Sequence, residues 1–413
     1  MNVQILSLAN PFQLYDVEES FGLNLLPSFK VLQMKVYLDN AATTPVAPEV
    51  FEAMLPILKN EFGNPSSTHL FGRSSKAIIE QSRRGIAKHI ACQPSEIVFT
   101  SGGTEADNMA MFTSVIELGV KRIVTSKIEH HAVGHTACHI QDKYEVELVY
   151  VDVDDAGNVD LEHLSIILGD TTKKTLVTLM HANNELGTLM PIMDVSRLCR
   201  KHGAYFHSDT VQTMGHYDFD LQDLDIDFLT CAAHKFHGPK GIGFLYINKA
   251  VHSKAFIHGG AQERGLRGGT ENLHGIVGLA KAMDLAYMGL EAHQKHVFGL
   301  KKHMIDSFKI HFPDISFHGE TSYEKSLYTV LNVCFPETDK AAMLLFTLDL
   351  KGIAASGGSA CSSGSSKGSH VLEGIHANPK RPNARFSFSR YTTKEEIDYA
   401  IEQVVEIFKN KIV

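Results

Sequence analysis

The chain has 413 residues, of which 44% are hydrophobic and 21% charged, so it can bury a large core in two domains or one large one. Its formal net charge of -8 provides no extended basic field for nucleic acid or an anionic membrane surface. No apolar run reaches the ~18 residues of a membrane span. The six cysteines are scattered, unlike those of a disulfide framework or a zinc site, so we expect a cytoplasmic protein.

Residues 1–33 differ in character from the rest of the chain. Their only basic residue is Lys30, which argues against both a secretory signal and an Arg-rich transit peptide. We interpret them as an extension of unknown role, either disordered or the product of an upstream start codon. A strand-and-turn pattern begins after Met34, and residues 34–48 are expected to pack with a small C-terminal domain.

The region from residue 49 to residue 290 is predicted to be a large α/β domain. Short β-branched or aromatic runs alternate with polar loops and helical stretches, and most gaps leave room for a crossover helix. A seven-stranded, mostly parallel sheet is therefore expected. The candidate strands are Ile97–Thr100, Arg122–Ser126, Val146–Tyr150, Leu176–Met180, Tyr205–Asp209, Phe228–Cys231 and Gly243–Ile247.

Residues 291–413 predict a smaller α+β domain. It begins with a long helix, continues with strands near Val330–Cys334 and Arg385–Ser389, and ends in a helix that starts at a capping box, Thr393 to Glu396. Between the two strands, 355–370 consists almost entirely of Ala, Gly and Ser and contains Cys361. This composition predicts a mobile loop.

Unusual polar residues follow the predicted strands, at the edge where open α/β sheets bind ligands. The glycine turn before Thr104 opens a helix, and such a helix start exposes N–H groups that bind phosphate. An ordinary turn is the alternative. Lys235 follows a buried strand among small residues, which favours a neutral amine for Schiff-base chemistry, and Asp209 could pair with a pyridinium nitrogen. A surface lysine and a helix-capping aspartate are the alternatives.

A cluster of histidines predicts a competing metal site. His131, His135 and His139 would share one face of a helix. However, no general-base glutamate follows the first histidine, and 23 histidines in the chain make chance clustering common. The metal site is therefore the weaker hypothesis.

Six motifs together carry a resemblance to a known family. From about Val36 to Phe408 the chain resembles the cysteine desulfurases of the NifS/IscS type, in the class V aminotransferase branch of fold-type-I PLP (pyridoxal 5'-phosphate) enzymes. The motifs are Tyr37-Leu38-Asp39-Asn40-Ala41-Ala42-Thr43-Thr44-Pro45, Phe62-Gly63-Asn64-Pro65-Ser66-Ser67, Thr100-Ser101-Gly102-Gly103-Thr104-Glu105, Asn183-Asn184-Glu185-Leu186-Gly187, His234-Lys235 and Gly358-Ser359-Ala360-Cys361.

The resemblance implies a set of cofactor contacts. Lys235 would bind PLP covalently, Asp209 would keep its pyridine nitrogen protonated, and His130 would stack on the ring and move protons. Asn184 and Gln212 resemble residues that hydrogen-bond the side of the cofactor that carries its phenolic oxygen. The phosphate would be held by Gly103, Thr104 and His234, with Thr270 supplied by the other subunit of a homodimer.

The resemblance also implies the substrate contacts and the reaction. Arg385, with Asn184, would hold the carboxylate of L-cysteine, a task suited to a planar guanidinium. The thiolate of Cys361 would take the substrate's sulfur as a persulfide, leaving L-alanine, and pass the sulfur to an acceptor or an iron–sulfur scaffold protein. No resident metal is expected, although Cys361 could contact an iron–sulfur cluster transiently.

Two features of the sequence limit this interpretation. Ala232 stands where many relatives have a serine that contacts the phosphate, and the chain ends soon after its last helix, so the sulfur acceptor stays open. The alternative activity is that of a selenocysteine lyase or another β-eliminating class V enzyme, because PLP chemistry alone does not select the leaving group. A degenerate, non-catalytic homologue would be expected to lack Lys235 or Cys361, and both are present.

Overall fold

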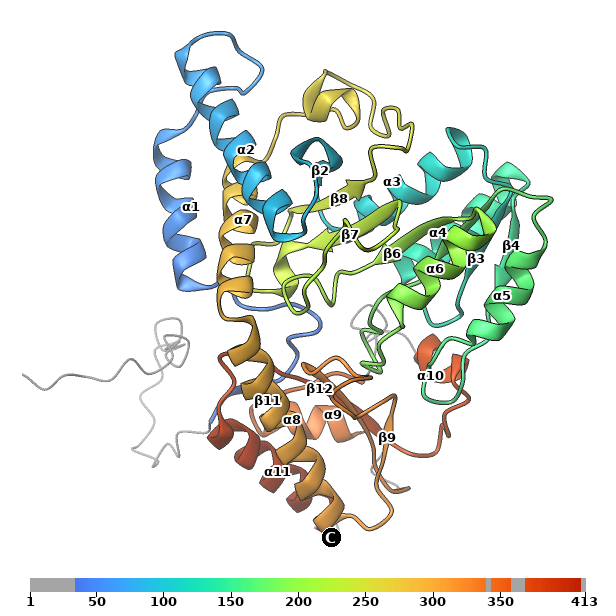
Figure 1. The fold of residues 1–413 in the computed structure, drawn as a ribbon. Helices are drawn as coiled ribbons and strands as arrows, with labels where there is room; N and C mark the ends of the chain where they lie inside the picture. The colour runs from blue at the N-terminus through green and yellow to red at the C-terminus, as the bar shows by residue number, and fades with distance from the viewer. Residues whose placement is uncertain (1–33, 339–342, 358–367, 410–413) are drawn as a thin grey trace, which may run out of the picture.

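The structure, a computed structural model, describes residues 34–338, 343–357 and 368–409. The other segments of the chain, including Cys361 and the N-terminal extension, lie outside the described residues. Figure 1 shows a large sheet with helices packed around it and, below it, a smaller sheet with its own helices.

The large sheet has seven strands in the order β2-β8-β7-β6-β5-β3-β4. All neighbours are parallel except β8, which runs antiparallel to both β2 and β7. The predicted seven-stranded, mostly parallel sheet is thus confirmed, with strand ends shifted by at most two residues. The strands are β2 Ile97–Thr100, β3 Arg122–Thr125, β4 Glu147–Tyr150, β5 Thr175–Thr178, β6 Tyr205–Asp209, β7 Phe228–Ala232 and β8 Gly243–Ile247.

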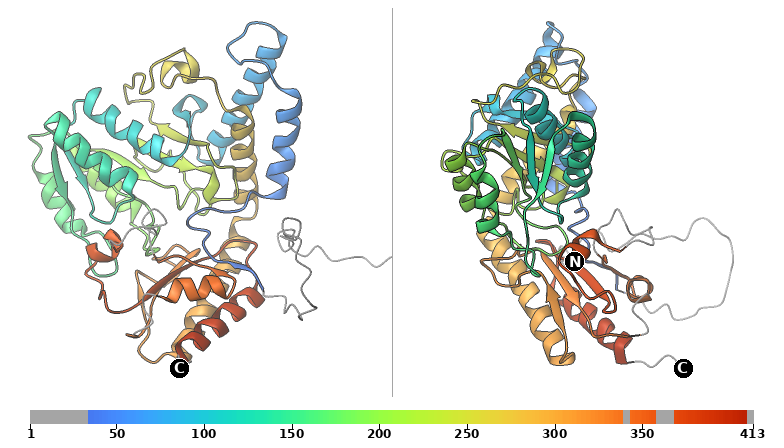
Figure 2. Two further views of the ribbon diagram at one scale, coloured as in Figure 1. Left: turned by 180° about the vertical axis from the view of Figure 1, so that it is seen from behind. Right: turned by 90° about the vertical axis from the view of Figure 1, so that its right-hand side faces the viewer.

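Helices cover both faces of this sheet, as the edge-on view in Figure 2 shows. On one face α3 and α4 bury residues such as Met109 and Val133. On the other face α1, α2, α5, α6 and α7 share a single core with the sheet, which includes Ile86, Leu164 and Ile276. The helices are α1 Pro48–Asn60, α2 Leu70–His89, α3 Gly103–Ile116, α4 His131–Tyr144, α5 Leu161–Gly169, α6 Ile192–His202 and α7 Leu273–Met288, with short 3-10 turns at Pro94–Glu96, Ala233–Lys235 and Gln262–Gly265.

The smaller sheet is antiparallel, in the order β12-β10-β9, and packs with α8, α9 and α11 around a second core that includes Phe308 and Phe386. The predicted capping box of the last helix is present: Thr393 and Glu396 each accept a hydrogen bond from the other's backbone N–H. The boundary expected near residue 290 coincides with the break between α7 and α8, and it stays a prediction. The elements are α8 Leu290–His311, β9 Ser316–His318, β10 Val330–Cys334, α9 Leu344–Leu350, α10 His370–Gly374, β12 Asn383–Ser387 and α11 Lys394–Lys409.

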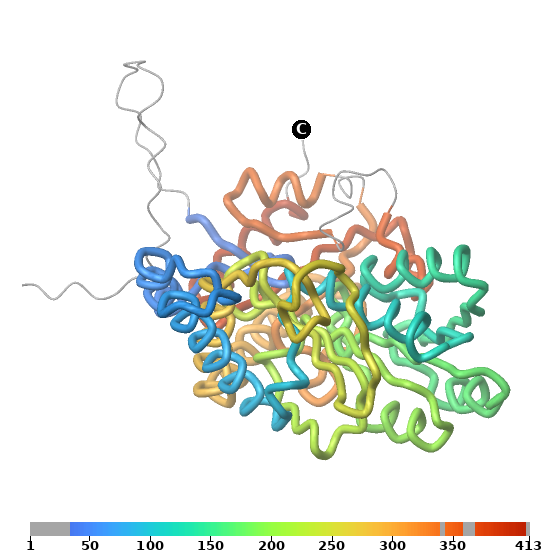
Figure 3. Tube along the Cα trace, turned by 90° about the horizontal axis from the view of Figure 1, so that it is seen from above, coloured from blue at the N-terminus to red at the C-terminus, as the bar shows by residue number. Residues whose placement is uncertain are grey.

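The first described residues join the two parts of the molecule. β1 (Val36–Tyr37) pairs in parallel with β11 (Ile353–Ala354), and the chain then continues toward the end of the large sheet. Figure 3 shows this blue segment lying against the red and orange C-terminal elements. None of the helices in the described part of the chain combines the length and the apolar character needed to cross a membrane.

Candidate active site

Nine of the eleven predicted site residues meet in a cavity of about 280 Å³ at the carboxyl ends of the large sheet's strands. Lys235 ends the short 3-10 turn that follows β7. Its ammonium nitrogen donates hydrogen bonds to the carbonyl oxygens of Ala41 (2.6 Å) and Ala42 (2.9 Å). The N-terminal segment thus holds the lysine in place, although more than half of the described chain separates them. The cavity is lined by Ala41, Ala42, Gly103, Thr104, Asp107, His130, Met180, Asn184, Asp209, Val211, Gln212, Ala232, His234, Lys235 and Arg385.

Two buried carboxyl groups lie on the floor of the cavity. Burial, and then the nearby carboxylate of Asp107, raise the pKa of Asp209 to about 7. Burial likewise raises the pKa of Asp107 to about 7, and its Oδ1 has no hydrogen-bond partner among the described residues. A cation beside the two groups would favour their ionised forms. The floor therefore fits a protonated pyridine nitrogen, as in PLP.

A third buried carboxyl group, that of Glu129, does not line the cavity but interacts electrostatically with both floor carboxyl groups. Glu129 accepts hydrogen bonds from the hydroxyl of Ser126 (2.8 Å) and from the backbone N–H of Met180 (2.9 Å). Burial is the main reason that the pKa of Glu129 rises to about 8. This group was not singled out from the sequence, because nothing local distinguishes it from a solvated glutamate.

His130 faces the cavity from the start of α4. Its Nδ1 accepts a hydrogen bond from the backbone N–H of Ala132 (3.2 Å), so the ring caps the helix and its neutral form carries the proton on Nε2. Burial, and then the charge of Lys235, lower the pKa of His130 to about 4. A neutral imidazole is therefore available beside the lysine.

The glycine turn and its helix form one end of the cavity. Gly102 has a φ of 153°, and α3 begins at Gly103. A Cβ at Gly103 would lie 2.7 Å from Val211, so glycine is required for this close approach. Because the free N–H groups at the start of α3 border the cavity next to Thr104, this end suits an anionic group such as phosphate.

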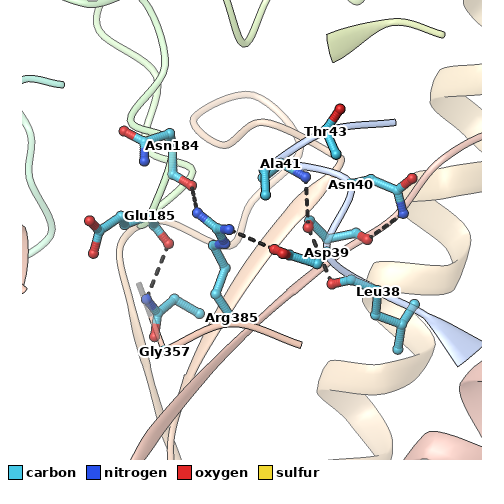
Figure 4. A network of polar contacts seen from close by, with 12 residues as sticks. Leu38, Asp39, Asn40, Ala41, Thr43, Asn184, Glu185, Gly357 and Arg385 are labelled. Atoms are coloured by element: carbon cyan, nitrogen blue, oxygen red, sulfur yellow. Dashed lines mark hydrogen bonds and ion pairs between the residues drawn. The ribbon is translucent and has the colours of Figure 1, made fainter. Parts of the chain in front are cut away.

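Arg385 enters from the opposite side, on β12 of the smaller sheet. Its guanidinium donates hydrogen bonds to the carbonyl oxygen of Asn184 (2.9 Å) and the carboxylate of Asp39 (2.8 Å), as Figure 4 shows. The side chain is only 1% exposed, and its Nε has no hydrogen-bond partner among the described residues. That N–H group could take a substrate carboxylate.

Four predicted site residues remain to be located. Gln212 donates to the carbonyl oxygen of Ala41 (3.0 Å), and the ring of His234 lies 3.1 Å from the hydroxyl of Thr43. Thr270 is exposed and does not line this cavity. Cys361 lies outside the described residues.

Comparisons with known proteins agree with this geometry. The family description "Aminotransferase class-V" matches residues 36–400. The chain belongs to the class-V aminotransferase family. Within it, the chain belongs to the NifS/IscS-type cysteine desulfurases, as its relatives show: it is 42% identical over 382 residues to "Cysteine desulfurase IscS" of Dictyoglomus turgidum, which covers 92% of this chain and 95% of the relative.

Two solved structures resemble this class-V aminotransferase over most of its length. A "NIFS-LIKE PROTEIN" superposes with a TM-score of 0.83 at 36% identity and covers 91% of this chain and 99% of its own. "SspA in complex with cysteine" superposes with a TM-score of 0.74 at 33% identity and covers 87% of this chain and all (100%) of its own.

Besides Glu129, sequence reasoning about this class-V aminotransferase missed two groups in and around the cavity. Asp39 lies within a motif that carried the resemblance, but its pairing with Arg385 joins residues 346 positions apart. Asp107 follows Thr104 by three residues on α3, so it lies on the same helix face as a predicted phosphate contact. That spacing was a usable signal for Asp107, whereas nothing local predicted the partner of Arg385.

Proposed function

We propose that this protein is a PLP-dependent cysteine desulfurase, which converts L-cysteine to L-alanine and carries the released sulfur as a persulfide on Cys361. The observation that carries the proposal is the meeting of Lys235, Asp209 and Arg385 in one cavity. The amine can react with the carbonyl group of a cofactor, and the buried acid can pair with a ring nitrogen of that cofactor. The guanidinium can hold the carboxylate of an amino-acid substrate.

The residues present fit PLP. Lys235 would bind it covalently, Asp209 would face the ring nitrogen, and the start of α3 with His234 would hold the phosphate. Gln212 and Asn184 would contact the side that carries the phenolic oxygen. When bound, PLP supplies an electron sink that stabilises negative charge at the substrate's α-carbon.

The chain's own residues would then perform three tasks. Arg385 would hold the substrate carboxylate and so orient the substrate's α-carbon toward Lys235. His130, neutral because of its low pKa, would exchange protons beside Lys235. The Cys361 thiolate would attack the substrate's sulfur, so that a sulfur–sulfur bond forms while the carbon–sulfur bond breaks and its electron pair stays on carbon.

A homodimer completes the proposal. Thr270 is exposed and outside its own chain's cavity, so it is free to complete the phosphate site of a second copy. The turn after α1 also exposes large apolar side chains: Phe62 is 78% and Leu70 67% exposed. Exposed apolar groups gathered at one place are typical of interfaces. We propose that the sulfur acceptor, an iron–sulfur scaffold or another protein, meets this dimer in the cytoplasm.

The test measures alanine and sulfide released from L-cysteine, with L-selenocysteine as the comparison substrate. We expect Cys361→Ala to bind PLP, to lose alanine formation from L-cysteine by several orders of magnitude, and to carry no persulfide. Cys138→Ala is the matched control, because Cys138 is exposed on α4, and it should retain activity.

Cys231 is the residue to watch in that experiment, since it precedes Lys235 by four positions. It is fully buried, and burial raises its pKa well above the usual value, so its thiol should stay unreactive. A persulfide on Cys231, or undiminished alanine formation by Cys361→Ala, would contradict the proposed nucleophile. A preference for selenocysteine that survives loss of Cys361 would favour selenocysteine lyase.

A further inference from the structure

Three histidines from two separate helices form a stack outside the Lys235 cavity. The rings of His131 and His135, on α4, have centroids 4.6 Å apart. The ring centroid of His370, the first residue of α10, lies 4.4 Å from the ring centroid of His131. None of the three lines the cavity that contains His130. His131 and His370 are half-buried and His135 is exposed, so solvent reaches the stack.

The backbone on both sides of the stack is firmly anchored. α10 buries Val371 and Ile375 against Ile128 and Leu186 in a small apolar cluster. The residue before His370, Ser369, donates a hydrogen bond of 2.5 Å to the carboxylate of Glu185. Since His131 and His135 lie one turn apart on a 14-residue helix, these contacts hold the three histidines next to one another.

The hydrogen bonding and the charge of the stack suit metal ligands. His370 Nε2 lies 2.8 Å from the backbone carbonyl oxygen of Glu129. A carbonyl can only accept, so this nitrogen carries the proton and Nδ1 keeps its lone pair. Histidines that bind metals usually show this arrangement, in which the second nitrogen donates to a carbonyl or carboxylate. Burial, then His370 and His135, lower the pKa of His131, which keeps its ring neutral.

We propose that His131, His135 and His370 form a binding site for a divalent transition metal of the class that prefers imidazole, such as Zn²⁺, Co²⁺ or Ni²⁺. The rings are stacked as they stand, and their nitrogens do not yet converge: among the described residues, only Asp107, His130 and Asp209 offer three ligand atoms within 4.8 Å of one another, and these belong to the Lys235 cavity. Metal binding therefore requires the three side chains to rotate.

This site differs from the metal site that the sequence suggested. His139 shares the helix face of His131 and His135, but its ring packs edge-on against Phe112 (centroids 6.2 Å apart). His370 takes the third position instead. A metal there would link α4 to α10, which follows the segment that contains Cys361. Because the N-terminal end of α4 carries partial positive charge, we expect weaker binding than at a three-histidine site in mid-helix.

The experiment titrates the purified full-length protein with Co²⁺ and follows the visible absorption of the bound ion, with Zn²⁺ equilibrium dialysis as a second measurement. We expect one site per chain in the wild type. His131→Ala, His135→Ala and His370→Ala should each weaken binding at least about tenfold. His139→Ala is the matched control and should bind as the wild type does.

Loss of the site in His139→Ala but not in His370→Ala would overturn the proposal in favour of the single-helix site. Absence of a Co²⁺ site in the wild type, or equal binding by all four variants, would also overturn it. Far-ultraviolet circular dichroism checks that each variant is folded, and His131→Gln replaces His131→Ala if the latter is not. The titration measures the bound metal itself, so its result can be separated from the activity proposed for the Lys235 cavity.

Discussion

The floor of the Lys235 cavity and its Arg385 side are built in different ways. On the floor, burial raises the pKa of Asp209 to about 7. Next to the floor, burial lowers the pKa of His130 to about 4. On the other side, the guanidinium of Arg385 is held by the carboxylate of Asp39, which lies 346 positions away in the chain.

Two different factors therefore set the properties of this one cavity. Of the two floor residues, Asp209 ends β6 of the large sheet and Asp107 lies on α3, and burial there sets their protonation. Arg385 reaches the cavity only when the smaller sheet and the N-terminal segment are both in place, so long-range contacts set its geometry. Substitutions on the floor should change charge and reactivity, whereas substitutions at Arg385 should change how substrate is held.

The largest effect is expected at Lys235. Lys235→Ala should fold but lack the visible absorbance of covalently bound PLP, and alanine formation should fall by several orders of magnitude. Absorbance spectra and product assays measure both. Lys240→Ala is the control, because Lys240 is exposed five residues later, and it should stay active. If PLP were bound covalently to another lysine of the Lys235→Ala protein, Lys235 would not be the residue that carries the cofactor.

The Arg385 side should respond mainly through substrate binding. Arg385→Lys keeps the charge but loses the planar fork, so kcat/KM for L-cysteine should fall about 100-fold, mostly through KM. Arg390→Lys, five residues further on, is the control and should behave as the wild type. If kcat fell instead while KM stayed constant, Arg385 would not be holding the substrate carboxylate.

The buried carboxyl groups at and near the floor should also make the stability of the protein depend on pH in a characteristic way. Glu129 has a pKa of about 8 when folded, against an ordinary value of 4.5. Between these values the native state binds more protons than the unfolded state, so stability is fully present below about pH 4.5 and is lost as the pH rises toward 8. Asp209 and Asp107 act in the same direction when no cation lies beside them.

Glu129→Gln should therefore flatten this pH dependence. We expect the free energy of unfolding to fall with pH by a few kcal/mol less in the variant than in the wild type. Urea unfolding at pH 5, 6.5 and 8, with PLP bound in both proteins, measures the difference. Parallel curves for the two proteins would mean that Glu129 is ionised in the folded state.

The smallest effect is expected far from the floor, at the cap of α11. Thr393→Ala removes the hydroxyl that accepts a hydrogen bond from the N–H of Glu396 (3.2 Å) and should cost about 1 kcal/mol of stability. The pH dependence of stability and the KM for L-cysteine should not change. A large rise in KM would show that the smaller sheet transmits local changes to Arg385.

The floor and the large sheet could be predicted from sequence because their signals are local. Each strand is a short apolar run, and the polar residues that matter lie at or just beyond its carboxyl end: Asp209 is the last residue of β6 and Lys235 ends the turn after β7. Arg385 was assigned through family resemblance alone, and its contact with Asp39 has no local signature. Asp107 was missed although its spacing from Thr104 pointed to it. The roles assigned to Thr270 and Cys361 stay predictions.

The pairing of β1 with β11 has a consequence for the order in which the protein is made. Tyr37 and Asp39 leave the ribosome early, but Ala354 and Arg385, to which they connect, are synthesised much later, with 346 positions between Asp39 and Arg385. At 5–20 residues per second, that delay is roughly 17–70 s. During this time the whole seven-stranded sheet can form. Arg385, which lines the cavity, is therefore added last, so the nascent chain cannot assemble a complete cavity until its translation is almost finished.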